Sequence, residues 1–319
     1  MKYDFKKDIK IYVAGHKGLI GSAFIRFFKK NGYKNIITQD KHELDLTCKE
    51  DTVNFFRENQ PEVVILAAGK VGGIIQNRDY PADFIFKNLS IQLNVLSAAR
   101  EYHVKRLIFF ASSCMYPKDT HQPMKENQLY TGHLELTSIA YASAKYAGVQ
   151  MCKSINEQNG FVTFIPVIPN TAYGPNDNFD LNSSHVLSAL IRRIHEAKEQ
   201  DSHKVVLWGT GSSKREFVFV DDIVGACILL LTSRLSNDLL PINIGVGSDI
   251  SIKSLAEKIS RMVGYSGKIK WDKSKPDGTP RKLLDNNRIE SIGWKATTDF
   301  DEGLECTYQW YLKNISQFQ

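Results

Sequence analysis

A tyrosine and a lysine four residues apart, Tyr141 and Lys145, form the arrangement with the clearest chemical meaning in this sequence. Residues i and i+4 share one face of a helix, so the ammonium group can lie beside the phenol. A nearby cation lowers the pKa of a phenol from about 10 toward the range that a general acid needs. With Ser112 about 30 residues upstream, the trio predicts a reductase. Ser112 would hydrogen-bond a substrate carbonyl, and Tyr141 would protonate its oxygen as hydride arrives.

A glycine-rich string, G-H-K-G-L-I-G, occupies residues 15–21, between an apolar run at 9–14 and a helical pattern at 22–30. Glycines at such a turn let the backbone approach a pyrophosphate at the positive end of the helix dipole. A structural turn is the alternative for glycines alone, but the strand–turn–helix context predicts dinucleotide binding. The expected cofactor contacts are Gly15, Lys17, Gly18, Leu19, Ile20, Gly21, Lys41, Asp45, Leu46, Ala67, Ala68, Tyr141, Lys145 and His185.

The charges near this loop favour NADPH over NADH. NADPH carries a 2′-phosphate that needs positive partners, whereas NADH needs a carboxylate on its ribose hydroxyls. Lys17 lies inside the glycine loop and Lys41 lies just past the second strand, so both are placed to meet a phosphate. Asp40 is the competing candidate for a ribose hydroxyl, and a solvent-facing role for each lysine stays open. Asp45 and Leu46 fit a contact with the adenine edge or a structural role.

Strands and helices alternate up to about residue 170, which predicts an α/β fold with a Rossmann-type, doubly wound parallel sheet. The expected strands are 9–14, 35–38, 61–68, 104–112 and 162–167. The expected helices are 22–30, 50–59, 88–102 and 140–159, with Leu89, Leu93, Leu96 and Ala99 on one face of the third.

Beyond Asn170 the pattern becomes irregular and predicts a smaller α/β substrate-binding domain, interleaved with the first. We expect residues 1–170 to form the NADP-binding domain, with segments near 205–245 returning to it. Residues 171–319 would mainly bind the nucleotide-sugar. The expected elements there are helices at 185–198 and 251–263, short strands at 205–208 and 217–220, and a loop at 273–282.

Composition excludes several classes of protein. The formal charge is +6, but lysine and arginine alternate with acidic residues, so no nucleic-acid partner is expected. No apolar stretch approaches the roughly 20 residues of a membrane span, and no signal peptide begins the chain, which favours a cytoplasmic protein. The five cysteines show no C-x-x-C spacing, so we expect neither a disulfide framework nor a metal site.

Several long strings resemble the GDP-L-fucose synthase family of extended short-chain dehydrogenases/reductases, the GDP-4-keto-6-deoxymannose 3,5-epimerase/4-reductases. They cover nearly the whole chain and are far more specific than the superfamily motifs. The strings are A-G-H-K-G-L-I-G, K-V-G-G-I, Y-P-A-D-F-I, S-S-C-M-Y-P-K, Y-G-P-N-D-N-F, S-H-V, W-G-T-G, R-E-F-V-F-V-D-D and S-K-P-D-G-T-P-R-K-L-L-D.

This resemblance implies two further catalytic groups, because epimerisation beside a ketone requires a base and an acid at carbons 3 and 5. The matching positions are Cys114 and His185, for which a buried inert thiol and a helix-end histidine are the alternatives. The resemblance also implies a homodimer through paired helices and a GDP-4-keto sugar as substrate. The implied substrate-binding residues are Arg193, Trp208, Arg215 and Lys282, which would pair the diphosphate and pack the base or sugar.

The chain departs from the family pattern at 136–140, 170–172 and 180–181, and Gly69 stands where the family has alanine. These changes affect the sugar end of the site, so a carbon-4 reductase without epimerase activity, acting on a GDP-4-keto-heptose, stays open. A silent NADP-sensing protein is disfavoured by the retained Tyr141 and Lys145. A 4,6-dehydratase or 4-epimerase with retained NAD is disfavoured by Lys17 and Lys41.

Overall fold

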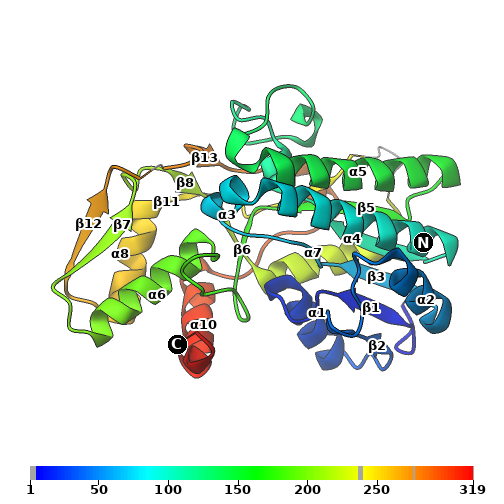
Figure 1. Cartoon of the computed structure of the whole chain (residues 1–319), viewed down its shortest axis with the longest axis horizontal. Helices are drawn as coiled ribbons and strands as arrows, with labels where there is room; N and C mark the ends of the chain where they lie inside the picture. Colours follow the sequence, from blue (N-terminus) through cyan, green and yellow to red (C-terminus); the bar gives the residue numbers. More distant parts are fainter. Residues whose placement is uncertain (1–4, 236–239, 276, 319) are drawn as a thin grey trace.

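The computed structural model describes residues 5–235, 240–275 and 277–318, which build two lobes around separate hydrophobic cores (Figure 1). The first lobe contains a six-stranded sheet in the order β10-β5-β4-β3-β1-β2, and every neighbouring pair is parallel. Its strands are β1 (Ile11–Ala14), β2 (Ile36–Ile37), β3 (Val63–Leu66), β4 (Arg106–Phe110), β5 (Phe164–Pro169) and β10 (Ile242–Ile244). This is the Rossmann-type, doubly wound sheet that the sequence predicts.

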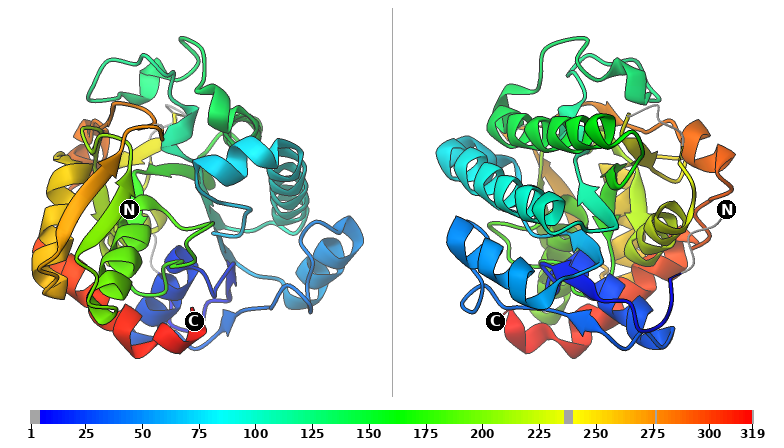
Figure 2. Two further views of the ribbon diagram at one scale, coloured as in Figure 1. Left: turned by 60° about the vertical axis from the view of Figure 1, so that its left-hand side comes forward. Right: turned by 90° about the vertical axis from the view of Figure 1, so that its right-hand side faces the viewer.

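Helices cover both faces of this sheet, as the right-hand view of Figure 2 shows. The strands carry apolar residues on both faces, V-V-I-L in β3 and L-I-F-F after Arg106 in β4, because neither face meets water. Helices α1 (Leu19–Lys30) and α7 (Val220–Thr232) pack in one core. Helices α2 (Lys49–Asn59), α4 (Pro81–Glu101) and α5 (Ile139–Asn159) pack in the other.

The second lobe, on the left in Figure 1, has an aromatic-rich core of its own. Its buried side chains include Tyr173, Phe179 and Tyr311, which come from distant parts of the chain. The lobe contains α6 (Val186–Glu199), α8 (Ile252–Val263) and α10 (Phe300–Lys313), and the parallel pair β7 (Lys204–Trp208) and β12 (Lys268–Asp272). Within the segment 205–245, β7 contributes to this second core, whereas α7 and β10 pack in the first lobe.

Two small sheets connect the lobes. One has the order β11-β8-β13, from β11 (Ile250–Ser251), β8 (Lys214–Arg215) and β13 (Arg281–Lys282), and the other pairs β6 (Thr171–Tyr173) with β9 (Phe217–Phe219). The remaining elements are α3 (Ile74–Asp79), α9 (Asn287–Ser291) and four 3-10 turns, η1 (Ser113–Met115), η2 (Glu126–Gln128), η3 (Leu136–Ser138) and η4 (Ile315–Gln317).

Two details of α4 differ from the sequence-based expectation. The helix begins at Pro81 rather than at 88, since proline is well accommodated in the first helical turn. Leu93 was expected on the packed face with Leu96 and Ala99. The last two are buried, together with Phe84 and Asn88, but 52% of Leu93 is exposed. The apolar pattern at 88–102 therefore contains one side chain that does not belong to the core.

Within the described residues, no helix combines the length and apolar character that crossing a bilayer requires.

Candidate active site

The glycine loop closes tightly on itself and on the end of β3. A Cβ atom on Gly21 would lie 2.1 Å from the carbonyl oxygen of Gly15, so only glycine fits there. Gly15 adopts a φ of +82°, and a Cβ atom on it would lie 2.8 Å from the backbone nitrogen of Ala68. Gly18 caps α1 with no side-chain hydrogen bond to the first backbone N–H groups. The turn thus offers helix N–H groups to an anion at close range, which fits a dinucleotide pyrophosphate.

The two lysines expected at the 2′-phosphate are placed differently. Lys17 Nζ donates to Asp40 Oδ2 at 2.6 Å, and His16 Nε2 lies 3.4 Å from the other carboxylate oxygen. The hydrogen bond from Lys17 is the main reason why the pKa of Asp40 is lowered. Lys41, one residue on, is exposed. Lys17 therefore neutralises Asp40, and Lys41 presents its charge to solvent.

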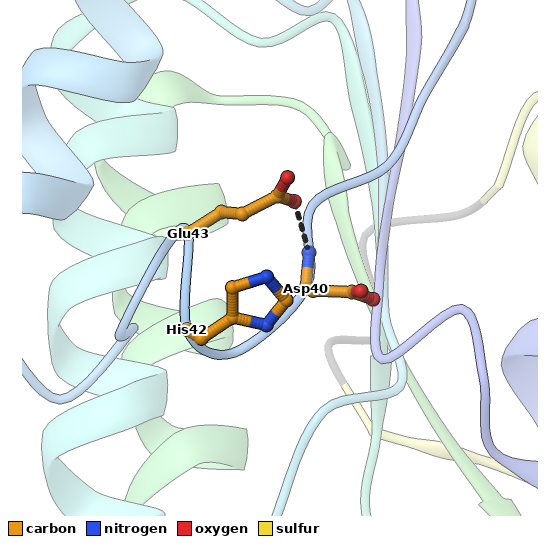
Figure 3. A group of neighbouring side chains, drawn as sticks. All are labelled: Asp40, His42 and Glu43. Carbon is orange, nitrogen blue, oxygen red and sulfur yellow. Dashed lines mark hydrogen bonds between the residues drawn. The ribbon is translucent and has the colours of Figure 1, made fainter.

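Figure 3 shows the side chains of Asp40, His42 and Glu43, whose ligand atoms lie within 4.8 Å of one another. Glu43 Oε2 already accepts the backbone N–H of Asp40 at 2.9 Å, and the Asp40 carboxylate is paired with Lys17. Both carboxylates thus have partners that a cation would have to displace, and His42 and Glu43 are exposed. We therefore do not interpret these three residues as a metal site.

Asp45 and Leu46 lie in the turn before α2. Asp45 Oδ1 accepts hydrogen bonds from the backbone and side chain of Thr47, at 2.9 and 2.8 Å, and these lower its pKa. Leu46 is buried, and its carbonyl oxygen accepts from Asn94 of α4 at 2.9 Å. Each residue therefore has a structural role in fixing this turn.

Ser112, Tyr141 and Lys145 meet at the carboxyl end of β4, where the first turns of α5 pass. Lys145 Nζ donates to the carbonyl oxygen of Phe110 at 2.8 Å and lies 5.8 Å from the centre of the Tyr141 ring. Phe84 of α4 contacts the Tyr141 ring edge-on, at 6.1 Å between centroids. The phenol is thus held between α4 and the end of β4.

The electrostatics of this trio differ from the sequence-based expectation. Burial raises the pKa of Tyr141, a negative Cys114 raises it further, and a hydrogen bond with Ser112 offsets only part of the effect. Burial also lowers the pKa of Lys145 to about 8. Lys145 does not lower the phenol pKa as expected, because burial is the dominant effect on both groups and the ammonium donates to the carbonyl oxygen of Phe110.

Cys114 lies in η1 between the lobes, next to Lys282 of β13. Lys282 Nζ is 3.5 Å from Cys114 Sγ. Burial alone would raise the pKa of the thiol, but the charge of Lys282 and hydrogen bonds from Ser112, Lys282 and Ser138 together lower it. A thiol in such surroundings is a stronger acid than an ordinary cysteine, so its thiolate is available as a base.

Two of the expected substrate-binding cations are neighbours in one sheet. Lys282 of β13 is the register partner of Arg215 of β8. Burial lowers the pKa of Arg215, while Cys114 and Asp277 act in the opposite direction. Asp277 accepts from the backbone and side chain of Thr210, at 2.7 and 2.8 Å, and so fastens the loop 273–282 beside these cations.

Arg193 and Trp208 form a second group with Lys275. The guanidinium carbon of Arg193 lies 5.8 Å from the centre of the Trp208 ring, and Lys275 Nζ lies 5.7 Å from it. Trp208 is 46% exposed, although large aromatic side chains usually bury most of their surface in the protein. An exposed ring with two cations nearby is suited to stacking on a planar base beside a diphosphate.

His185 is exposed and caps α6, directly after the loop that carries Asp177. Asp177 is buried, which raises its pKa, while a hydrogen bond from Ser188 and the charge of His185 act against this. A Cβ atom on Gly73 would lie 3.5 Å from the carbonyl oxygen of Ser184. The histidine is thus held where the K-V-G-G string of the first lobe approaches the second.

Sequence reasoning missed three residues that support the site: Ser138, Glu216 and Asp277. Ser138 hydrogen-bonds the Cys114 thiol from one of the segments that depart from the family pattern. The carboxylate of Glu216 is buried and accepts from the backbone of Val246 and Leu284, at 2.7 and 2.9 Å. Glu216 and Asp277 both occur in matched strings, R-E-F-V and K-P-D-G, which was the available signal.

The fold and the site together define a nucleotide-binding enzyme of the extended Rossmann type. The pattern of the NAD dependent epimerase/dehydratase family matches residues 11–245. The chain belongs to this family.

Its relatives narrow the class. The chain is 50% identical to GDP-L-fucose synthase 1 of Arabidopsis thaliana over 97% of its own length and 95% of the relative. It is 43% identical to GDP-L-fucose synthase of Escherichia coli, covering 97% of this chain and 98% of the relative. Among solved structures, a GDP-mannoheptose C4 reductase from Campylobacter jejuni with NADP bound has a TM-score of 0.89 at 35% identity. That match covers 97% of this chain and all of the other.

Proposed function

We propose that this protein is an NADPH-dependent GDP-L-fucose synthase, which epimerises a GDP-4-keto-6-deoxymannose at carbons 3 and 5 and reduces the ketone at carbon 4. One observation carries both halves: the Ser112–Tyr141 pair lies beside Cys114, a thiol whose pKa is lowered. A reductase alone needs no acidified thiol next to its proton donor. The identity of 50% to a GDP-L-fucose synthase along nearly the whole chain supports the same conclusion.

The residues of the glycine loop fit the cofactor. Gly15 and Gly21 leave room for a pyrophosphate, and Lys17 and Lys41 supply positive charge at the adenosine end. Ala67 and Ala68, directly after β3, line the loop, and we assign Asp45 and Leu46 to the adenine side. When bound there, NADPH supplies the hydride for reduction.

In the reduction, this chain contributes hydrogen bonds and a proton. Ser112 donates to the ketone oxygen, and Tyr141 transfers its phenolic proton to that oxygen as negative charge develops on it. The raised pKa of Tyr141 keeps the phenol protonated until then. Lys145, fixed on the Phe110 carbonyl, keeps positive charge beside the phenolate that remains.

In the epimerisation, the Cys114 thiolate takes a proton from the carbon beside the ketone, which leaves a thiol and an enolate. Ser112 and Tyr141 stabilise the enolate oxygen. His185 then returns a proton to the opposite face of the same carbon. Cys114 releases to solvent the proton that it took and His185 regains one from solvent, so both groups return to their starting states. His185 is exposed at the start of α6, so its imidazole is accessible to a bound substrate or cofactor.

The second lobe binds the nucleotide end of the substrate. Trp208 stacks on the guanine, and Arg193 and Arg215 meet the diphosphate. We assign residues 1–170, together with the returning elements α7 and β10, to the cofactor-binding domain, and the rest of 171–319 mainly to the nucleotide-sugar.

A second candidate is a carbon-4 reductase of a GDP-4-keto-heptose. It is favoured by the segment 136–140, where Leu136 is 78% exposed and Ile139 is 43% exposed beside the catalytic tyrosine. The similarity to a GDP-mannoheptose C4 reductase agrees with it.

One experiment separates the two candidates. Purified enzyme is incubated in heavy water with GDP-4-keto-6-deoxymannose and no NADPH, and deuterium at carbons 3 and 5 is followed by NMR. An epimerase loads deuterium, and Cys114→Ser suppresses the loading while reduction of an already epimerised substrate persists. If the wild type reduces its substrate but no deuterium enters, the carbon-4 reductase is the correct function.

We further place the enzyme in the cytoplasm as a homodimer that pairs through α4 and α5. Phe86 and Leu93 lie seven residues apart on one side of α4 and are 69% and 52% exposed, so an apolar stripe is left without cover in the single chain. Light scattering should give twice the 36.2 kDa chain mass, and Leu93→Glu should give the monomer.

A further inference from the structure

We propose that Lys282 is a positioning residue whose ammonium group holds Cys114 as a thiolate before substrate binds. The inference rests on the proposed function only for the catalytic role of the thiolate, which is to act as the base in epimerisation. It reassigns Lys282, which the sequence places with the diphosphate, to the base of the epimerase site.

The contact itself is the first support. Lys282 Nζ donates to Cys114 Sγ at 3.5 Å, a distance normal for a hydrogen bond to sulfur, across 168 positions of sequence. The hydroxyls of Ser112 and Ser138 also hydrogen-bond the sulfur. An ammonium and two hydroxyls around one sulfur atom form a donor set that matches a negative acceptor.

Two other cysteines of the same chain provide an internal comparison. Cys152 and Cys227 are both fully buried in helices, and burial raises the pKa of each thiol. Cys114 experiences burial in the same direction, yet its pKa is lowered. Lys282 supplies the largest of the effects that oppose burial, so the cation is what distinguishes Cys114.

The backbone of Lys282 is fixed from the first lobe, which makes the position of the ammonium group specific. Its carbonyl oxygen accepts from Asn170 Nδ2 and from the backbone of Glu216, each at 3.3 Å. Two residues on, Leu284 N donates to the Glu216 carboxylate at 2.9 Å. Asn170 lies in a segment that departs from the family pattern, and it helps to hold β13 in place.

The neighbouring cation explains how the diphosphate is still bound. Arg215 is the register partner of Lys282 on β8, and its five N–H donors suit a phosphate better than one ammonium group does. Lys282 can therefore stabilise the thiolate while Arg215 binds the diphosphate.

The test measures the thiol directly. Alkylation of Cys114 by iodoacetamide is followed from pH 5 to 10 by mass spectrometry of its peptide, without substrate or NADPH. The variants are Lys282→Met, Lys282→Arg as the rescue, and Lys214→Met as the matched control, since Lys214 is an exposed cation on β8. We expect Lys282→Met to move the midpoint up by about one pH unit, so that alkylation at pH 7 slows roughly tenfold. The arginine variant and the control should keep the wild-type midpoint.

Deuterium exchange in the same variants separates this inference from the proposed function. If the midpoint of Lys282→Met equals that of the wild type while the wild type exchanges deuterium, the role of Lys282 is wrong and the function stands. If the midpoint moves but the wild type exchanges no deuterium, Lys282 stabilises the thiolate and the epimerase function is wrong. Melting curves exclude misfolding, and should Lys282→Met not fold, Lys282→Gln replaces it.

Discussion

Lys145 and Tyr141 share one face of α5, and the lysine ammonium lies 5.8 Å from the centre of the tyrosine ring. The ammonium is also bound to the end of β4, because it donates to the carbonyl oxygen of Phe110 at 2.8 Å. The ring of Phe109 lies beneath it at 5.0 Å. The lysine is therefore anchored to β4, which fixes both its own charge and the helix that carries the tyrosine.

Replacing Tyr141 with phenylalanine should remove the proton donor and little else. The edge-on contact with Phe84 at 6.1 Å depends on the ring, so packing should be preserved. We expect turnover to fall by roughly 10²- to 10⁴-fold, the usual contribution of a general acid. NADPH oxidation gives the rate, and an unchanged NADPH dissociation constant is the control. A variant that reduces substrate at nearly the normal rate would show that another group donates the proton.

The burial of Lys145 should be visible in the pH dependence of stability. Its pKa falls from 10.5 to about 8 on folding, so between these values the unfolded chain holds a proton that the folded chain has released. The free energy of unfolding contributed by this residue therefore rises with pH across that window, by at most about 1.4 kcal/mol per pH unit.

Urea unfolding of the ligand-free protein at several pH values from 8 to 10.5 measures this slope. Lys145→Met has no proton to release, so its slope should be smaller than that of the wild type. Only the difference in slope matters, because the substitution also changes packing. Equal slopes would mean that Lys145 keeps its ordinary pKa in the folded protein.

The parallel sheet could be predicted from the sequence because its strands are short apolar runs separated by helical patterns. Helix α7 was not predicted, although its sequence from Val220 contains the run A-C-I-L-L-L, because a helix buried on most sides shows no amphipathic period. Helix α10 was not predicted either, for a different reason. Its aromatic residues pack in the second core, which is assembled from segments far apart in the sequence, such as β7 and β12. No local pattern shows that this core exists.

The site shows the same division between local and non-local information. Tyr141 and Lys145 follow from a spacing of four, and the glycine loop follows from its own string. The contact between Cys114 and Lys282 joins positions 168 residues apart, so no local sequence pattern predicts it. Desolvation is equally invisible in the sequence, which is why the pKa of Tyr141 was expected to fall and instead rises.

Two glycines of the cofactor loop should respond very differently to the same added methyl group. A Cβ atom at position 21 would lie 2.1 Å from the carbonyl oxygen of Gly15, and one at position 18 would lie 3.6 Å from the same atom. The first distance is a severe clash with the backbone, whereas the second is an ordinary contact. Gly21→Ala should therefore lower the melting temperature of the ligand-free protein by several degrees.

Gly18→Ala serves as the matched control, with the same methyl group in the same turn. Its melting temperature should stay close to that of the wild type, although its NADPH affinity falls because the methyl group faces the expected pyrophosphate. Melting curves recorded without cofactor test the steric argument alone. Equal stability of the two variants would contradict the tight packing of Gly21 against Gly15.

Cofactor selection should depend on Lys41 more than on Lys17. Lys17 is bound to Asp40 at 2.6 Å, so in meeting a 2′-phosphate it gives up an existing ion pair. Lys41 is exposed beside that pair and gains a partner without losing one. We expect Lys41→Ala to weaken NADPH binding roughly tenfold, equivalent to about 1.4 kcal/mol, and to leave NADH binding nearly unchanged.

The comparison needs a control for general charge, since removing any lysine weakens the attraction of an anion. Lys29→Ala removes an exposed cation from the last turn of α1, at the opposite end of that helix from the glycine loop, and should leave both affinities as they are. Fluorescence titration with each cofactor at one salt concentration gives the four dissociation constants. If the wild type binds NADH more tightly than NADPH, Asp40 rather than Lys41 determines the choice. The carboxylate would then accept the ribose hydroxyls once Lys17 has turned away from it.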